Sequence, residues 1–283
     1  MDNNSLTIRV MTRSEIGIAI DWAACEGWNP GLYDADCFYS ADPNGFLVGL
    51  LNNEPIATIS VVKYSSDFGF LGFYIVKPGF RGQGYGLQIW QKGMSYLNGC
   101  NIGLDGVIDQ QENYRKSGFR LAYRNIRYMG KGGGKAPADA DIVPLSEIPF
   151  YEISTYDQLF FPGDRSQFLN RWINQPESLA LGILQNNKLA GYGLIRICRT
   201  GYKVGPLFAE TPLLAEQLFT ALKAHAAEEI PVFLDIPETN PAALELVVRH
   251  RMIPSFETAR MYTKESPALP LHKIYGVTSF ELG

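Results

Sequence analysis

Histidine and cysteine are scarce in this chain of 283 residues. The three histidines are scattered and the four cysteines form no C-x-x-C pair, so the sequence offers neither zinc-ligand spacing nor a disulfide framework. We therefore expect reduced thiols and no metal. Dense runs of Lys and Arg are also missing and the formal net charge is −4, which gives no reason to expect a nucleic-acid partner. A cationic small molecule suits this charge better.

Long apolar runs are missing as well. No run approaches the roughly 20 apolar residues that cross a bilayer, and residues 1–10 have neither a basic nor an apolar segment of the kind found in export signals. We expect a cytoplasmic protein with no membrane partner. A chain of 283 residues is long enough for two domains, each with its own core.

The most informative feature present is the segment 71–97, in which a strand, a glycine-rich turn and a helix follow one another. Phe73–Val76 is an apolar run suited to a buried strand, and Pro78 ends it before the turn RGQGYG at 81–86. Glycines let successive backbone N–H groups face one point, and the helix start adds free donors and the positive end of its dipole. This arrangement is typical of a diphosphate-binding site.

Two well-known phosphate-binding motifs fit this segment less well. A P-loop requires Lys and then Ser or Thr at the helix start, but Leu87 and Gln88 follow Gly86. The dinucleotide motif G-x-G-x-x-G is half met, because Leu87 replaces its third glycine. Asp105 lies about 20 residues further on, where that motif has its ribose-binding acid. A nicotinamide-binding domain is therefore the weaker alternative.

A third motif fits better. V-x-P-x-x-R-G-x-G-x-G at 76–86 resembles the pyrophosphate signature R/Q-x-x-G-x-G/A of the GNAT superfamily of N-acetyltransferases. Y-R-K-S-G-F at 114–119 resembles the Y-x-K-x-G-F segment of the same superfamily, although Val107 replaces the usual upstream Asn. The two motifs occur in the expected order, and the resemblance covers about the first 130 residues. It implies a GNAT acyl-CoA N-acyltransferase fold, an α/β fold with a mixed sheet.

The order of predicted elements repeats along the chain. The expected strands are 6–10, 46–51, 55–64, 73–76, 102–107 and 121–128, then 179–184, 189–198, 202–208 and 232–236, with helices at 14–26, 212–228 and 241–250 and one ending near Leu97. We infer two tandem copies of the fold, namely residues 1–130 with the acetyl-CoA site and residues 142–283. The glycine-rich stretch 131–141 is predicted to be a linker.

The second copy lacks the features that bind phosphate in the first. Before its helix it has Phe208-Ala209-Glu210-Thr211-Pro212, which contains no glycine and places a carboxylate where a phosphate would lie. We therefore predict that residues 142–283 form a degenerate, non-catalytic copy. A repeat within one chain can replace a dimer partner, so a monomer is slightly favoured.

The resemblance also implies a set of site residues. Tyr114 would give a proton to the departing CoA thiolate, as a phenol with a pKa near 10 can. Asp105 is the favoured base or ammonium anchor for the acceptor, and a structural hydrogen-bonding role is the alternative. The predicted acetyl-CoA-binding residues are Ile75, Val76, Arg81, Gly82, Gln83, Gly84, Tyr85 and Gly86. The predicted acceptor-binding residues, in the loop that covers the acceptor side of the fold, are Trp28, Asn29, Tyr33 and Asp34.

These residues predict an N-acetyltransferase that moves the acetyl group of acetyl-CoA to a primary amine by direct attack, preferably on a small-molecule amine. Polyamine, amino sugar, amino acid, peptide N-terminus and protein lysine are all open as acceptors. The alternative is an acyl-CoA sensor that binds the same cosubstrate without turnover.

Overall fold

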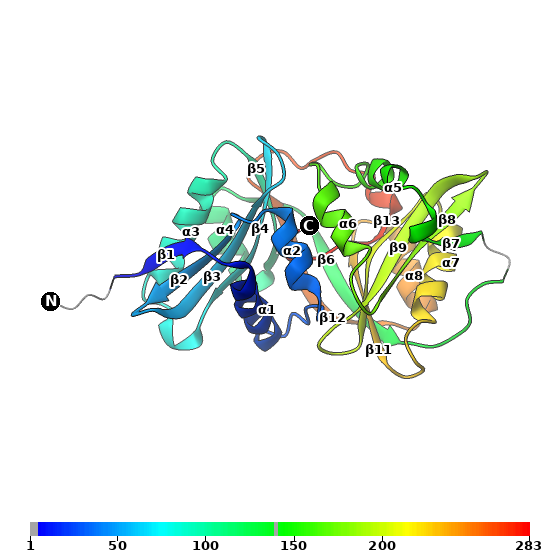
Figure 1. Cartoon of the computed structure of the whole chain (residues 1–283), viewed down its shortest axis with the longest axis horizontal. Coiled ribbons are helices and arrows are strands. Elements are labelled where there is room, and N and C mark those ends of the chain that lie inside the picture. Colours follow the sequence, from blue (N-terminus) through cyan, green and yellow to red (C-terminus); the bar gives the residue numbers. More distant parts are fainter. Residues whose placement is uncertain (1–4, 139–140) are drawn as a thin grey trace.

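The computed structural model describes residues 5–138 and 141–283. Within them, thirteen strands form one mixed sheet that runs through the whole molecule, with helices packed on its faces (Figure 1). The strands are β1 (Thr7–Val10), β2 (Phe46–Leu51), β3 (Glu54–Lys63), β4 (Phe68–Val76), β5 (Asn101–Val107), β6 (Arg120–Lys131), β7 (Ile142–Pro144), β8 (Ser178–Gln185), β9 (Lys188–Ile197), β10 (Tyr202–Ala209), β11 (Pro231–Pro237), β12 (Ile253–Tyr262) and β13 (Ile274–Gly276).

The helices follow the predicted alternation of strand and helix. They are α1 (Ile16–Cys25), α2 (Asp34–Ala41), α3 (Tyr85–Tyr96), α4 (Gln111–Lys116), α5 (Phe150–Asp157), α6 (Ser166–Trp172), α7 (Pro212–Lys223) and α8 (Pro241–Arg249). Every strand and helix named above from the sequence is present, although the helix expected over 212–228 ends at Lys223 and the strand expected over 73–76 begins at Phe68. None of the helices in the described residues is long and apolar enough to cross a bilayer.

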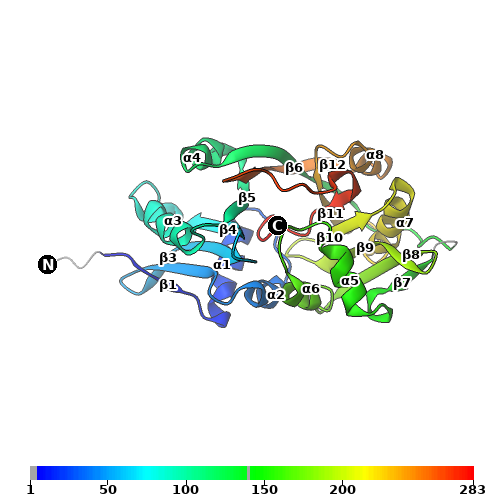
Figure 2. The same ribbon diagram turned by 90° about the horizontal axis from the view of Figure 1, so that it is seen from above.

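The two halves of the chain exchange their last strands. β12, from the second half, lies between β5 and β6, and β6, from the first half, pairs with β11 (Figure 2). The order across the sheet is β1-β2-β3-β4-β5-β12-β6-β11-β10-β9-β8-β7. The sheet is therefore continuous past the predicted linker at 131–141, and each structural unit contains a strand from the other half of the chain. Residues 139 and 140 of that linker lie outside the described residues.

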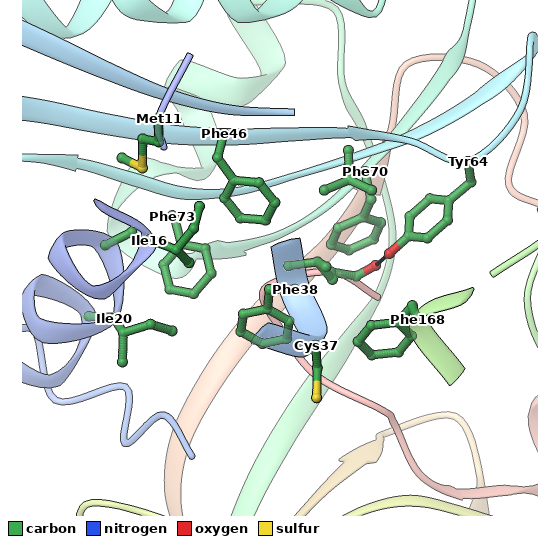
Figure 3. Packing of buried hydrophobic residues seen from close by; sticks show 14 of the residues in the cluster. Met11, Ile16, Ile20, Cys37, Phe38, Phe46, Tyr64, Phe70, Phe73 and Phe168 are labelled. Carbon is green, nitrogen blue, oxygen red and sulfur yellow. Dashed lines mark hydrogen bonds between the residues drawn. The ribbon is translucent and has the colours of Figure 1, made fainter. Parts of the chain in front are cut away.

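Aromatic side chains from both halves share one core. Phe38 of α2 packs edge-on against Phe73 at 5.6 Å and stacks on Phe168 and Trp172 of α6 at 6.4 Å and 5.7 Å. Figure 3 shows Phe38 among Phe73 and Phe168. All four side chains are buried. Burial of this aromatic area joins the two halves through the hydrophobic effect.

β4 and β5 diverge halfway along their length. Their parallel pairing ends at Leu71 and Leu104, whereas β4 stays paired with β3 up to Val76. A register shift places two residues, Phe73 and Tyr74, opposite one residue of β3, and Phe73 has a φ of +45°. The Thr58 hydroxyl donates a hydrogen bond of 2.8 Å to the Phe73 carbonyl and holds this bulge in place. Beyond Leu71, one edge of β4 is thus left without a neighbouring strand.

The last residues of the described chain are buried between the two halves (Figures 1 and 2). The Tyr64 hydroxyl donates to the Leu282 carbonyl at 2.9 Å, and Arg165 Nη1 donates to the Gly283 carbonyl at 3.1 Å. The Glu281 backbone presses on β4, because a Cβ on Gly72 would come within 2.1 Å of its carbonyl oxygen. The segment 277–283 therefore lies beside the point where β4 and β5 separate.

Candidate active site

A cavity of about 640 Å³ fills the gap between the diverging ends of β4 and β5. One end reaches the glycine turn at 81–86, and the wall along β5 continues to Tyr114 of α4. The other end is formed by the second half of the chain, through residues of β12 and of the segment 277–283. This volume lies in the range of small-molecule and cofactor sites.

The glycine turn combines left-handed backbone with open space. Gly82 and Gly84 have φ values of +75° and +84°, which L side chains rarely adopt, and Gly84 is the N-cap of α3 without any side-chain cap from the described residues. A Cβ at either position would meet no described heavy atom within 4 Å, so the space before the turn is open. Gly86 allows α3 to approach β4 closely, since a Cβ there would lie 2.7 Å from the Tyr74 hydroxyl. The start of α3, with its uncapped backbone N–H groups, therefore lies beside an accessible space.

Six of the eight predicted cofactor-binding residues line this cavity, and Gln83 and Tyr85 do not. Arg81 is one of the six. Its Nε donates to the Val76 carbonyl at 2.8 Å, and its guanidinium forms an ion pair with Glu26, which also lines the cavity. Arg81 is 49% exposed, so this pair is weak enough to open for a phosphate. Gln83 instead donates to the Gly79 carbonyl at 3.0 Å.

Tyr114 lines the cavity. It is 7% exposed, and its ring stacks on Trp90 at 5.8 Å. β5 approaches the ring closely at Gly106, where a Cβ would come within 2.1 Å of a Tyr114 ring carbon. Burial, assisted by the nearby Tyr74, raises the pKa of the Tyr114 phenol above its ordinary value. The hydroxyl therefore stays protonated at neutral pH and is available as a proton donor.

Asp105 also lines the cavity, but its carboxylate is already occupied. Arg260 of β12 binds it at 2.9 Å and 2.5 Å through two guanidinium nitrogens, and Asn125 of β6 donates to it at 2.8 Å. The Asp105 side chain is fully buried. These bonds satisfy the carboxylate as an ion-pair partner, so the geometry favours a structural role for Asp105 over the predicted role of base.

The predicted acceptor loop mostly binds the second half of the chain. Asn29 exchanges two hydrogen bonds with the Thr200 backbone at 2.9 Å and 2.8 Å, and the Tyr33 hydroxyl donates to Glu177 at 2.6 Å. The Asp34 side chain is buried and forms an ion pair with Arg196 at 2.9 Å. Of the four predicted residues, Trp28 lines the cavity and the other three do not. Their polar groups are engaged by the other half of the chain and are not directed to a substrate.

The second half of the chain contributes four cavity residues, none of which was predicted from the sequence: Phe256 and Thr258 of β12, and Phe280 and Glu281 of the segment 277–283. Thr258 Oγ1 and Glu281 Oε2 are buried polar atoms without a hydrogen-bond partner in residues 5–138 and 141–283. The alternating run 253–262 (IPSFETARMY) could have indicated a strand. The pattern does not show that this strand lies between β5 and β6, because that position results from the strand exchange.

The corresponding helix start in the second half is closed. Thr211 caps α7 by accepting a hydrogen bond from the Leu214 backbone at 3.3 Å. Glu210 is paired with Lys273 at 2.5 Å and accepts a hydrogen bond from Tyr156 at 3.3 Å. A filled cap and a carboxylate leave no anion site there, which supports the prediction of a non-catalytic copy.

The strand–turn–helix unit and the splayed strands of the first half, with a second unit of the same element order, define a tandem acyltransferase fold. The models described as "Acetyltransferase (GNAT) family" and "Acetyltransferase (GNAT) domain" match residues 16–119 and 153–276. The chain is 30% identical over 282 residues to holothin acyltransferase of Pseudoalteromonas sp. strain SANK 73390, with 100% of this chain and 96% of the relative covered. The chain belongs to the GNAT acetyltransferase family and is a tandem member of it.

Solved structures share this fold. A crystal structure from Pyrococcus horikoshii, described as a candidate acetyltransferase, superimposes with a TM-score of 0.84 at 21% identity and covers 100% of this chain and 98% of its own. A tandem GNAT protein of the clavulanic acid biosynthesis pathway has a TM-score of 0.64 at 12% identity, with coverage of 93% and 100%. The predicted family and the two-copy α/β fold are thus confirmed, and the chain is an acyltransferase of the kind that uses acyl-CoA.

Proposed function

We propose that this acyltransferase moves the acetyl group of acetyl-CoA to a primary amine by direct attack of the amine on the thioester. The observation that carries the proposal is that the open glycine turn at 82–86 and the buried phenol of Tyr114 line one cavity at the divergence of β4 and β5. A binding module would need the turn, but it would have no use for a protonated phenol at the strand divergence.

The arrangement supports the following roles. The diphosphate accepts hydrogen bonds from the backbone N–H groups of residues 82–86, and the pantetheine arm lies along the free edge of β4 at Ile75 and Val76. The thioester then lies where the strands separate, and a β4 backbone N–H stabilises the oxyanion that forms. Tyr114 gives its proton to the departing thiolate.

A small-molecule amine is the proposed acceptor. The cavity is lined by aromatic side chains and by the segment 277–283 and has a volume of about 640 Å³, which suits a compact amine. The relative named holothin acyltransferase is named for one defined acceptor, and we propose that this chain also serves a defined amine compound. We also propose that the protein acts in the cytoplasm and as a monomer.

The direct test is release of CoA thiol from acetyl-CoA in the presence of pooled primary amines. Tyr114→Phe should lower kcat by about 100-fold, because the thiolate then departs without its proton donor. Acetyl-CoA affinity, measured by calorimetry, should stay within about twofold. Because burial raises the pKa of Tyr114, the wild-type rate should not fall through loss of this proton until the pH exceeds about 10, the ordinary tyrosine value.

Tyr151→Phe is the matched control, since Tyr151 is exposed on α5 and should leave the rate unchanged. Equal kcat values for Tyr114→Phe and the wild type would remove Tyr114 from the mechanism. Calorimetric binding of acetyl-CoA without thiol release from any amine would instead support the acyl-CoA sensor.

A further inference from the structure

The part of the cavity formed by the second half of the chain contains deeply buried polar groups. Thr258 and Glu281 both line it, and each has a side-chain oxygen that is buried without a hydrogen-bond partner in the described chain. Glu281 as a whole is 3% exposed. Buried polar atoms are nearly always paired, so an unpaired oxygen on each of two residues that line one cavity indicates a place for a ligand with hydrogen-bond donors.

Glu281 lies next to the expected reaction centre. Its carbonyl oxygen would lie 2.1 Å from a Cβ on Gly72, the residue that follows the last β4–β5 pair at Leu71. The bulge at Phe73 and Tyr74 comes directly after Gly72. The Glu281 side chain therefore starts from a backbone position close to the divergence of the two strands, where the proposed thioester lies.

Glu281 lies among buried positive charges. Its carboxylate interacts electrostatically with three buried cations, Arg127 of β6, Arg196 of β9 and Lys203 of β10. Arg127 and Arg196 already form ion pairs with Asp235 and Asp34. Lys203 is the cation of this group that has no carboxylate hydrogen bond in the described chain, and it donates to the Trp28 carbonyl at 3.4 Å. Glu281 therefore lies near a buried cation that has no carboxylate partner of its own, and its Oε2 has no hydrogen-bond partner in the described residues.

We propose that Glu281 binds the acceptor ammonium and takes its proton before attack, and that the acceptor is a primary amine on a flat, apolar body. This inference rests on the proposed acetyl transfer. Asp105 is a weaker candidate, because Arg260 and Asn125 already occupy its carboxylate.

The acceptor class follows from the walls around Glu281. Trp28, Phe73, Phe256 and Phe280 line the same cavity, and Phe256 and Phe280 lie 6.3 Å apart, centroid to centroid. The Arg127 guanidinium lies 4.9 Å from the Phe280 ring and fixes its position. Aromatic walls bury an apolar or aromatic group favourably, and one carboxylate satisfies one ammonium. A polyamine or amino sugar would leave further polar groups unpaired here.

The proton balance of this step is complete. The ammonium gives one proton to the Glu281 carboxylate, the neutral nitrogen bonds to the thioester carbon, and the carbon–sulfur bond breaks. Tyr114 protonates the departing sulfur, and the second proton lost from nitrogen restores the phenol. The products are the N-acetyl amine and CoA thiol, and the proton held by Glu281 passes to solvent.

The test compares acceptors that differ in protonation. Glu281→Gln should lower kcat/KM for 2-phenylethylamine, which is an ammonium at pH 7, by about 100-fold. For p-anisidine, an aromatic amine that is neutral at pH 7, the loss should be less than about fivefold, because no proton has to be removed before attack. Acetyl-CoA affinity should change by less than about twofold. The control Glu229→Gln alters a carboxylate that is 67% exposed and paired with Lys131, and should leave both rates unchanged.

A second measurement uses the wild-type protein and does not depend on the folding of a variant. With acetyl-CoA absent, 2-phenylethylamine should bind at least about tenfold more tightly than 2-phenylethanol, which has the same body without the charge. Equal affinities, or equal losses of activity for both amines in Glu281→Gln, would overturn the role of Glu281. Acetylation of spermidine or glucosamine but not of arylalkyl amines would overturn the acceptor class. If the wild type releases no thiol with any amine, the proposed acetyl transfer itself fails.

Discussion

Gly84 determines how α3 begins. Its φ of +84° belongs to the left-handed region. A Cβ at this position would have no described heavy atom within 4 Å. Gly79, five positions earlier in a short 3₁₀ turn, also has open space around a Cβ, but its φ is not positive. A comparison of alanine variants at the two positions therefore separates two effects. Both variants add a methyl group, but only the one at Gly84 also changes a left-handed residue at the proposed anion site.

Gly84→Ala should lower the free energy of unfolding by about 1–2 kcal/mol, the cost of a left-handed alanine. It should also weaken acetyl-CoA binding by about tenfold, because the methyl group projects into the space where the diphosphate would lie. Gly79→Ala should leave both quantities nearly unchanged. Thermal unfolding and calorimetry on the two variants check this, and equal acetyl-CoA affinities would show that the turn does not bind the diphosphate.

Helix α2 shows how one element carries two carboxylates with different roles. Asp34 at its start is buried and forms an ion pair with Arg196 of the second half, and it also accepts a hydrogen bond of 2.7 Å from the Gly31 backbone. Asp36 is 59% exposed and pairs with Arg13. A buried pair that loses one partner leaves an uncompensated charge, whereas an exposed pair is screened by water. The helix is therefore attached to the second half mainly through Asp34 and the aromatic core around Phe38.

Asp34→Asn should lower the free energy of unfolding by about 3–5 kcal/mol, since Arg196 then stays buried without its counter-charge. Asp36→Asn, two positions along the same helix, should cost less than about 1 kcal/mol. Denaturant unfolding of both variants measures the difference. A similar small loss for both would show that Asp34 contributes no more than a surface pair.

The strand exchange joins the two halves of the chain in one sheet. β12 pairs with β5 through Arg260 opposite Asp105, and β6 pairs with β11 through Arg127 opposite Asp235. Both contacts combine backbone pairing with a buried ion pair. The first half alone would expose the open edge of β5 and leave β6 without a partner, which favours aggregation over folding.

Residues 1–138 produced alone should therefore show no cooperative thermal unfolding. Produced together with residues 139–283, the two pieces should associate and regain acetyl-CoA binding, since the exchanged strands supply the missing pairs. Circular dichroism and size-exclusion chromatography test this. A piece 1–138 that folds cooperatively and binds acetyl-CoA on its own would contradict the dependence on β12.

Local sequence features predicted much of the first half of the site. The positions of Gly82, Gly84 and Tyr114 follow from short-range patterns, namely a turn that needs positive φ and a helix that follows β5. The acceptor side was not predictable in this way. Asn29, Tyr33 and Asp34 have the composition of a ligand loop, but their partners lie more than 140 positions away along the chain.

The sequence by itself determined the strand–turn–helix unit, the repetition of the fold and the family, because each depends on the order and spacing of neighbouring residues. The tertiary structure alone decided that β6 and β12 change places, that Asp105 is bound by Arg260, and that Glu281 reaches the cavity. These outcomes depend on which distant strands and tails can bury their apolar faces and pair their charges together. Such long-range packing leaves no local pattern in the sequence.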